Sequence, residues 1–126
     1  MSEGHGQCFV SVDDNIVYIK SVGAFNLEGM IKATQDIKSA VLTLDNNSFK
    51  LLADYTELEG ATPEAFDYLD DFNVWLNKQN LIAKAVVISS AITLTILGQQ
   101  VPTRKLQNDK NFRTKDEALE WLLQQD

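Results

Sequence analysis

The segment 49–69 constrains the fold most, because it joins an apolar run to a polar turn and then to a helix with a clear start. Its first residues are apolar enough for a central strand, buried on both faces. Thr62 and Pro63 favour a helix N-terminus, with a hydroxyl at the cap and a proline where no N–H is missed. We therefore expect the strand to end at Asp54, and the connection over 55–61 to shape a pocket rim.

An opening hairpin and a first long helix are expected before this segment. Apolar and polar residues alternate on both sides of 13–15, which favours two antiparallel strands joined by a short acidic turn. The second strand is expected over 16–21, with Gly23 ending it. Asn26 is placed to cap the helix that follows, in which apolar residues recur at helical spacing up to Val41.

The C-terminal half continues the alternation of strands and helices. A buried strand is expected over 84–88, a short apolar helix over 91–97 and a weaker last strand over 104–107. Thr114 and Glu117 form a capping-box pattern at the start of the final helix. This order predicts an α/β fold: a small mixed sheet of about five strands, opening with an antiparallel hairpin and continuing with parallel strands, flanked by helices.

Size and composition predict one cytoplasmic domain. The 126 residues, 44% hydrophobic and 23% charged, suit a single globular domain over residues 1–126, and we expect residues 1–6 to form a mobile tail. Cys8 is the only cysteine, as is common in a reducing cytoplasm, and the start lacks the basic and apolar regions of an export signal. The longest apolar run, 85–97, is too short to cross a bilayer, so no transmembrane segment is expected.

The charge balance argues against nucleic acid as a partner. Eighteen acidic and eleven basic residues give a formal net charge of -7, which repels a polyanion on average. Five basic residues near the C-terminus are interpreted as a solvated edge: Arg104, Lys105, Lys110, Arg113 and Lys115. The acidic face of the second long helix is likewise interpreted as solvated, and no metal is predicted there.

No motif in the sequence compels a reaction. His5 is the only histidine and lies in the expected tail, and there is no G-x-S-x-G elbow, phosphate-binding loop or zinc spacing. A carboxylate dyad of Asp54 with Glu57 or Glu59 leaves hydrolase activity open. The sequence therefore predicts a protein that is not an enzyme and that needs no cofactor.

A ligand or partner site is expected where the parallel strands end. Ligands of open α/β sheets bind beyond the carboxyl ends of the strands, near helix N-termini. If the strands that carry them are neighbours, six polar or aromatic residues share one rim: Asp54, Tyr55, Thr56, Thr62, Ser89 and Ser90. The alternative is that the Ser and Thr hydroxyls only cap helices, and that Asp54 only accepts from loop N–H groups.

The chain resembles the SpoIIAA-like group of STAS-type proteins, a bacterial family sometimes labelled STAS/SEC14. The resemblance covers nearly the whole chain and rests on the opening hairpin, on 49–69, on 84–88 and on the pattern F-x-x-x-x-E-A-x-x-W-L over 112–122. It implies a mixed sheet flanked by helices and a non-enzymatic role in binding proteins or small ligands. Regulatory members carry a phosphorylatable serine in an Asp-Ser-Ser-Gly-type turn, which this chain lacks, so Thr56 or Thr62 would be a substitute phosphorylation site.

Two functions follow as expectations. The first is a binding or regulatory domain that contacts a partner protein through the rim over 54–63. The alternative is a carrier of a small apolar or anionic ligand held beneath the helix expected over 91–97. The oligomeric state is not fixed by the sequence, and a homodimer is compatible with it.

Overall fold

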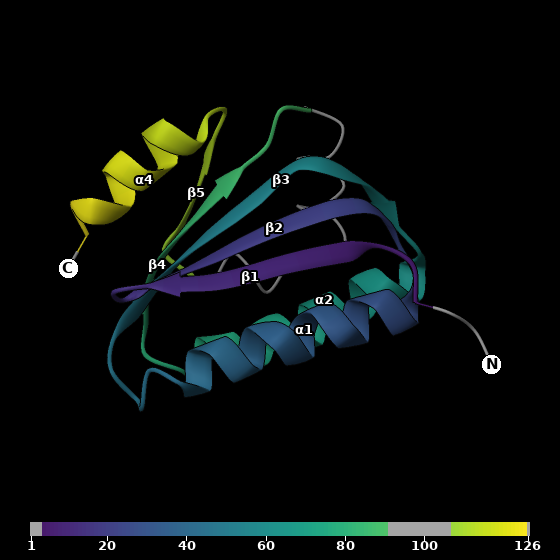
Figure 1. Ribbon diagram of the computed structural model, residues 1–126, viewed down its shortest axis with the longest axis horizontal. Helices are drawn as coiled ribbons and strands as arrows, with labels where there is room; N and C mark the ends of the chain where they lie inside the picture. Colours follow the sequence, from purple (N-terminus) through teal and green to yellow (C-terminus); the bar gives the residue numbers. More distant parts are fainter. Residues whose placement is uncertain (1–3, 91–106, 126) are drawn as a thin grey trace.

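The computed structural model describes residues 4–90 and 107–125 (Figure 1). The elements run in the order β1 (Gln7–Asp13), β2 (Ile16–Phe25), α1 (Leu27–Leu42), β3 (Phe49–Ala61), α2 (Pro63–Asn77), β4 (Leu81–Val87), β5 (Asp109–Phe112) and α4 (Lys115–Leu123). The strands form one sheet in the order β1-β2-β3-β4-β5. β1 is antiparallel to β2, and every later pair is parallel, which confirms the predicted mixed sheet.

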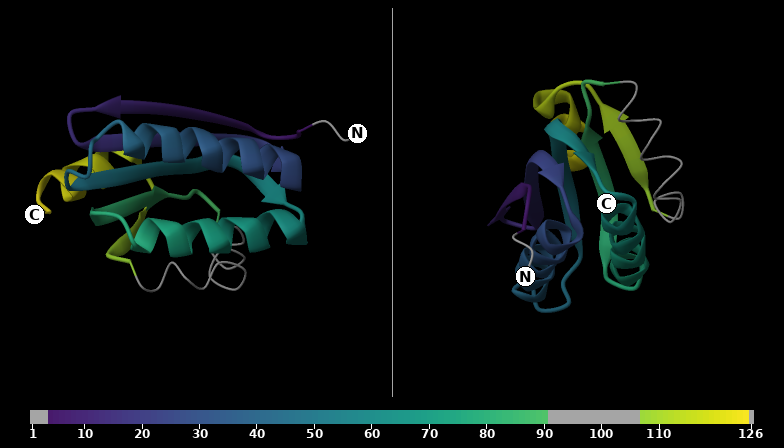
Figure 2. Two further views of the ribbon diagram at one scale, coloured as in Figure 1. Left: turned by 90° about the horizontal axis from the view of Figure 1, so that it is seen from below. Right: turned by 90° about the vertical axis from the view of Figure 1, so that its right-hand side faces the viewer.

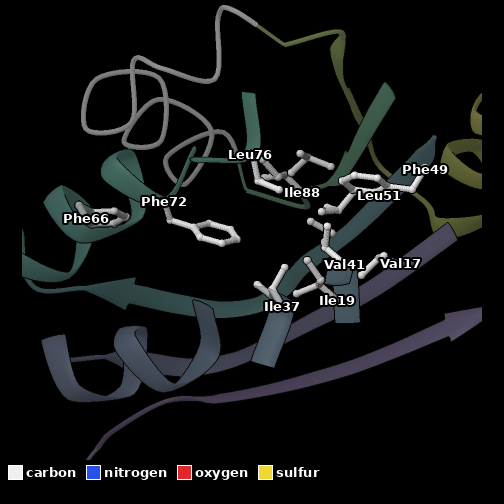
Figure 3. Close-up of a cluster of buried hydrophobic side chains, with 12 residues drawn as sticks. Val17, Ile19, Ile37, Val41, Phe49, Leu51, Phe66, Phe72, Leu76 and Ile88 are labelled. Carbon is white, nitrogen blue, oxygen red and sulfur yellow. The ribbon is translucent and has the colours of Figure 1, made fainter. Parts of the chain in front are cut away.

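The sheet separates two layers of helices. α1 and α2 lie side by side on one face, and α4 lies on the other (Figures 1 and 2). β3 is buried on both faces because successive side chains alternate: Leu51 and Ala53 point toward α1 and α2, whereas Leu52 packs beneath α4. Figure 3 shows the larger core cluster between the sheet and the two long helices. The predicted central strand is therefore correct.

The three predicted helix caps are confirmed. In each case a side-chain oxygen accepts from a backbone N–H three residues further on, as N-caps do. The pairs are Asn26 with Gly29 at 2.9 Å, Thr62 with Ala65 at 3.3 Å, and Thr114 with Glu117 at 3.3 Å. No helix within the described parts of the chain is long and apolar enough to cross a membrane.

The predicted ends of β2 and β3 are wrong. Gly23 does not end β2, which continues to Phe25, and β3 does not end at Asp54 but continues to Ala61. The physical reason is that each strand supplies the other with a hydrogen-bonding partner over this extension, where Ala61 lies opposite Phe25. β4 stops at Val87, so beyond that point β3 pairs with β2 alone.

The predicted last strand is also displaced. Its residues 104–106 lie outside the described residues, as does the helix expected over 91–97, and Gln107 forms a bend. The fifth strand is instead Asp109–Phe112, which runs parallel to β4. The fourth strand spans Leu81–Val87 where 84–88 was expected.

The N-terminal segment contacts the start of α1. The backbone N–H of His5 donates to Asn26 Oδ1 at 2.8 Å, the same oxygen that caps α1. Gly29 makes this approach possible, since a Cβ there would lie 1.8 Å from the His5 carbonyl oxygen. Residues 4–6 are thus held near α1, and the motion of the expected tail stays a prediction.

A polar cluster is buried where β4, β5 and α2 meet. Lys84, only 3% exposed, donates from Nζ to Asn73 Oδ1 at 3.3 Å and to Gln107 Oε1 at 3.4 Å. Its Nζ also lies 4.0 Å from a carboxylate oxygen of Asp109, which is its register partner on β5. A buried charge needs such partners. The cluster therefore ties β5 to β4 and to α2.

Candidate functional site

The expected rim residues do not form one site. Asp54 lies within β3 and pairs with Val87, the last residue of β4. Ser89 and Ser90 therefore follow shortly after the β4 residue that pairs with Asp54. Thr62 lies eight residues further along, which at about 3.3 Å per strand residue places it roughly 25 Å from Asp54. Tyr55 points to the opposite face of the sheet and packs against the core beneath α1 and α2. The six residues therefore divide among four places: the pair Asp54 and Thr56, Tyr55, Thr62, and the pair Ser89 and Ser90.

Asp54 and Thr56 mark a β-bulge in β3. Lys20 pairs with Asp54 and Val22 with Glu57, so two residues of β3 lie opposite one residue of β2. Asp54 Oδ1 accepts from the N–H of Thr56 at 2.9 Å and from its hydroxyl at 2.7 Å. The polar residues that predicted a turn thus bend a strand that continues. The Asp54 carboxylate does accept from a nearby backbone N–H, as the alternative interpretation expected.

Asp54 belongs to a part of the sheet that α4 leaves uncovered. α4 packs mainly on β3, β4 and β5, so none of the described helices lies above much of β1 and β2 on this face. Phe9 of β1 is 57% exposed there. A shallow groove of about 190 Å³, here called the open-face groove, is lined by Phe9, Val10, Ser11, Tyr18, Ile19, Lys20, Leu52, Asp54 and Lys115.

The open-face groove carries both signs of charge beside its aromatic rings. Lys20 Nζ lies 2.5 Å from a Glu57 carboxylate oxygen, and this hydrogen bond and charge raise the pKa of Lys20 above its usual value. Lys115 Nζ lies 5.5 Å from the centre of the Tyr18 ring, within cation–π range. Burial, with a smaller contribution from Asp13, raises the pKa of Tyr18, so its phenol is protonated at neutral pH. The groove thus offers two cations, a phenol donor and the Asp54 carboxylate.

Sequence reasoning missed Phe9 and Tyr18 as functional candidates. The sequence did contain a signal, since Phe9 alternates with the apolar residues Cys8, Val10 and Val12 and so falls on the polar side of β1, together with Gln7 and Ser11. An aromatic residue on the polar side of an amphipathic strand marks exposed apolar surface. Whether α4 would cover that side was not evident from the sequence.

Ser89 and Ser90 lie in a separate depression at the carboxyl ends of β4 and β5. Both serines are exposed, and the basic side chains of Lys110 and Arg113 line the same depression. This depression, here called the β4–β5 depression, has a volume of about 800 Å³. It is lined by Ile88, Ser89, Ser90, Lys110, Asn111, Phe112, Arg113 and Glu117. The start of α4 separates it from the open-face groove, because Lys115 lines the groove and Glu117 the depression.

The space between the sheet and the two long helices is nearly filled. A cavity of about 30 Å³ remains there, lined in part by Cys8, Ser21 and Thr34. Burial raises the pKa of the Cys8 thiol to about 11, which makes it a poor nucleophile at neutral pH. The cavity is about a tenth of the roughly 300 Å³ at which small-molecule pockets begin.

Metal-binding chemistry has little support in the described part of the chain. Among residues 4–90 and 107–125, no three His, Cys, Asp or Glu side chains converge to hold an ion. Asp67 and Asp71 of α2 are exposed, in keeping with a solvated acidic face.

Comparisons with known proteins identify the fold. The sequence matches no protein-family model and no curated protein. The structure is similar to an uncharacterised protein of the DUF3478 family with a SpoIIAA-like fold from Shewanella loihica PV-4, with a TM-score of 0.66 and 21% identity over 97% of each chain. It is also similar to an anti-sigma factor antagonist from Mycobacterium paratuberculosis, with a TM-score of 0.69 and 17% identity over 94% of this chain and 95% of that one. The chain therefore has a SpoIIAA-like α/β fold, as its sequence predicted.

Proposed function

We propose that this protein is a non-enzymatic interaction domain that binds a partner protein through the open-face groove. The observation that carries the proposal is the bare half of the sheet beside α4, where Phe9 is 57% exposed within a ring of charged side chains. The likeness in fold to an anti-sigma factor antagonist supports a regulatory role that depends on protein partners. The proposed contact surface keeps Asp54 and Thr56 from the expected rim and adds β1 and β2.

The composition of the groove suits a protein partner better than a small molecule. Protein interfaces place aromatic anchors at the centre and polar groups at the rim. Here Phe9 and Tyr18 supply the apolar centre, whereas Lys20, Asp54 and Lys115 supply charges around it. A volume of about 190 Å³ is below the roughly 300 Å³ at which small-molecule pockets begin. A partner that inserts one apolar side chain and pairs with both signs of charge fits this surface.

Thr56 is the better of the two substitute phosphorylation sites. Thr56 is exposed at the bulge, next to Asp54 and Glu57, whereas the Thr62 hydroxyl already caps α2. A phosphate on Thr56 adds roughly two negative charges and repels an acidic partner. Intact-mass measurement of the protein from its native cell tests this: an added phosphate located at Thr56 supports it, and an unmodified mass under all growth conditions contradicts it.

Affinity capture with matched variants tests the proposed surface. Phe9→Glu puts a charge at the centre of the groove, and we expect it to abolish capture of the protein that the wild-type chain retains from native lysate. Leu42→Glu is the control, because Leu42 is 68% exposed at the end of α1, on the other side of the sheet. Equal loss in both variants, or retention in Phe9→Glu, would contradict the proposal.

The β4–β5 depression favours a second candidate, binding of an anionic ligand. Ser89 and Ser90 supply hydroxyl groups, and Lys110 and Arg113 supply positive charge, in a molecule of net charge -7. Titration with inorganic phosphate, followed by amide chemical shifts, tests this candidate. Saturable shifts at Ser89 and Ser90 that disappear in Arg113→Gln support it, and shifts spread over all lysines contradict it. The carrier site expected beneath 91–97 lies outside the described residues.

A further inference from the structure

We propose that β1 pairs with β1 of a second copy of this chain, in antiparallel orientation, and joins the two sheets into one. β1 is an outer strand that pairs only with β2 in the described structure. It forms the upper margin of the left-hand view in Figure 2, and no described element lies beyond it. An edge strand presents a row of N–H and C=O groups with no strand partner, which is a template for pairing with another strand.

β1 lacks the features that protect sheet edges from pairing. Such edges usually carry lysine, proline or a bulge, or are very short. β1 spans seven residues without lysine or proline, and its register with β2 is continuous. Two of the five large hydrophobic residues that are exposed in the described structure lie on it, Phe9 at 57% and Val12 at 39%. The edge is therefore apolar, regular and open.

The sequence of β1 is compatible with itself when the strand is reversed. The register that pairs all seven residues of both copies places Val10 on the two-fold axis and Gln7 opposite Asp13 of the second copy. Asp13 is the only charged residue of β1, so this register puts no like charges opposite each other. It also sets Cys8 opposite Val12, and the two Phe9 rings become diagonal neighbours within reach of one another.

This self-complementarity, with no like charges opposed and the seven residues of both copies paired, is the feature that favours a second copy as the occupant of the edge. The pairing rests on the backbone edge of β1, whereas the proposed partner site uses the face of the sheet, and Phe9 is the residue that the two surfaces share. The two surfaces are also compatible: pairing at the edge places the open-face grooves of both copies on one continuous sheet.

Sedimentation equilibrium tests the pairing. We expect the wild-type chain to approach twice the monomer mass as concentration rises, and Val12→Lys, which adds an edge lysine outside the core, to weaken this association by at least about tenfold. Since each copy carries a net charge of -7, raising the salt from about 0.02 M to about 0.5 M should strengthen it. A monomer at all concentrations, or an undiminished dimer in Val12→Lys, overturns the proposal.

A disulfide tests the register. Cys8 and a cysteine at position 12 are about 13 Å apart within one strand, so Val12→Cys cannot close a bond within the chain. Opposite positions of paired antiparallel strands lie within disulfide range. Oxidation of Val12→Cys with diamide, carried out at pH 9 and followed to completion because the Cys8 thiol ionises late, should therefore give a covalent dimer linked between positions 8 and 12. A non-covalent dimer that forms no such bond, or an equal yield in Leu42→Cys, overturns the register.

Discussion

The two ends of the sheet are built in opposite ways. At the β5 end the strand is four residues long, includes Lys110, lies under α4 and is tied inward by the buried Lys84 cluster. At the β1 end the strand is seven residues long and carries exposed Phe9 and Val12, with no helix over one face. The short, charged edge is typical of a strand protected from pairing. The long, apolar edge is typical of one that binds.

This difference assigns the stability of the fold to the β5 end of the sheet and the proposed binding of partners to the β1 end. Interactions that hold the fold together gather at the β5 end and under the two long helices, where side chains are buried. The side chain of Phe9 on the open face of β1 is exposed. Its removal should change binding without changing the free energy of unfolding. The following predictions test this separation, beginning with the largest expected effect.

Lys84→Ala should destabilise the β5 end most. It removes a buried cation and leaves the Asp109 carboxylate buried, a change that costs about 3 to 5 kcal/mol. The double variant Lys84→Met with Asp109→Leu removes both charges and should recover most of that loss. Urea unfolding measures both variants. A loss below about 1 kcal/mol for Lys84→Ala would show that the cluster does not hold this end of the sheet.

Cys8 should react slowly with alkylating agents, because it lies on the covered side of β1. With a pKa of about 11 against the usual 9.0, its thiolate population at pH 8 is roughly 100-fold lower than that of a free cysteine. Burial favours the neutral thiol, so the associated stability is fully present below pH 9 and is lost as the pH rises toward 11. Iodoacetamide labelling as a function of pH checks this. Labelling as fast as in urea would mean that both faces of β1 are open.

Thr62→Ala should cost about 1 kcal/mol of stability, because the hydroxyl caps α2. Thr62→Ser keeps the oxygen and should retain most of that stability in urea unfolding. Both variants should capture the partner protein as well as the wild-type chain does, since Thr62 lies far from the open-face groove. Loss of capture in Thr62→Ala with normal unfolding would move the binding surface toward the start of α2.

Phe9→Ser should leave stability unchanged within about 0.5 kcal/mol, as exposed substitutions usually do. Leu122→Ala is the contrast on the same face of the sheet, since Leu122 is the fully buried residue by which α4 packs on the sheet, and its truncation costs about 2 to 5 kcal/mol. Thermal unfolding of the two variants compares the open and covered halves directly. Similar losses for both would show that Phe9 is part of the core.

The order of elements, the caps and the central strand could be predicted because each depends on local spacing or on one hydrogen bond. Asn26, Thr62 and Thr114 illustrate this. The ends of β2 and β3 could not, because Gly23 and Asp54 look like terminators locally and are overruled by pairing between the two strands. A bulge and a turn require the same polar residues.

The candidate site was harder to predict than the fold. Its position depends on which strands α4 covers, and that depends on contacts far apart in the sequence, such as Lys115 with Tyr18. Asp54 and Thr56 were identified from composition, and the structure leaves Asp54 half-buried and Thr56 exposed. Phe9 was assigned to a strand, but the exposure of its side chain was not predicted. The buried Lys84 was visible in an otherwise apolar strand, but its partners on α2 and β5 were not.

The most direct test is site-specific photo-crosslinking from position 9 in the native cell. A benzophenone amino acid replaces Phe9 in one strain and, in another, Leu42 at the end of α1, which is at least as exposed as Phe9. If the β1 end is the binding surface, position 9 should give cross-linked adducts, to a partner protein for the groove and to a second copy for the edge, and position 42 should give neither. Adducts from position 42 alone, or none from position 9, would contradict this account.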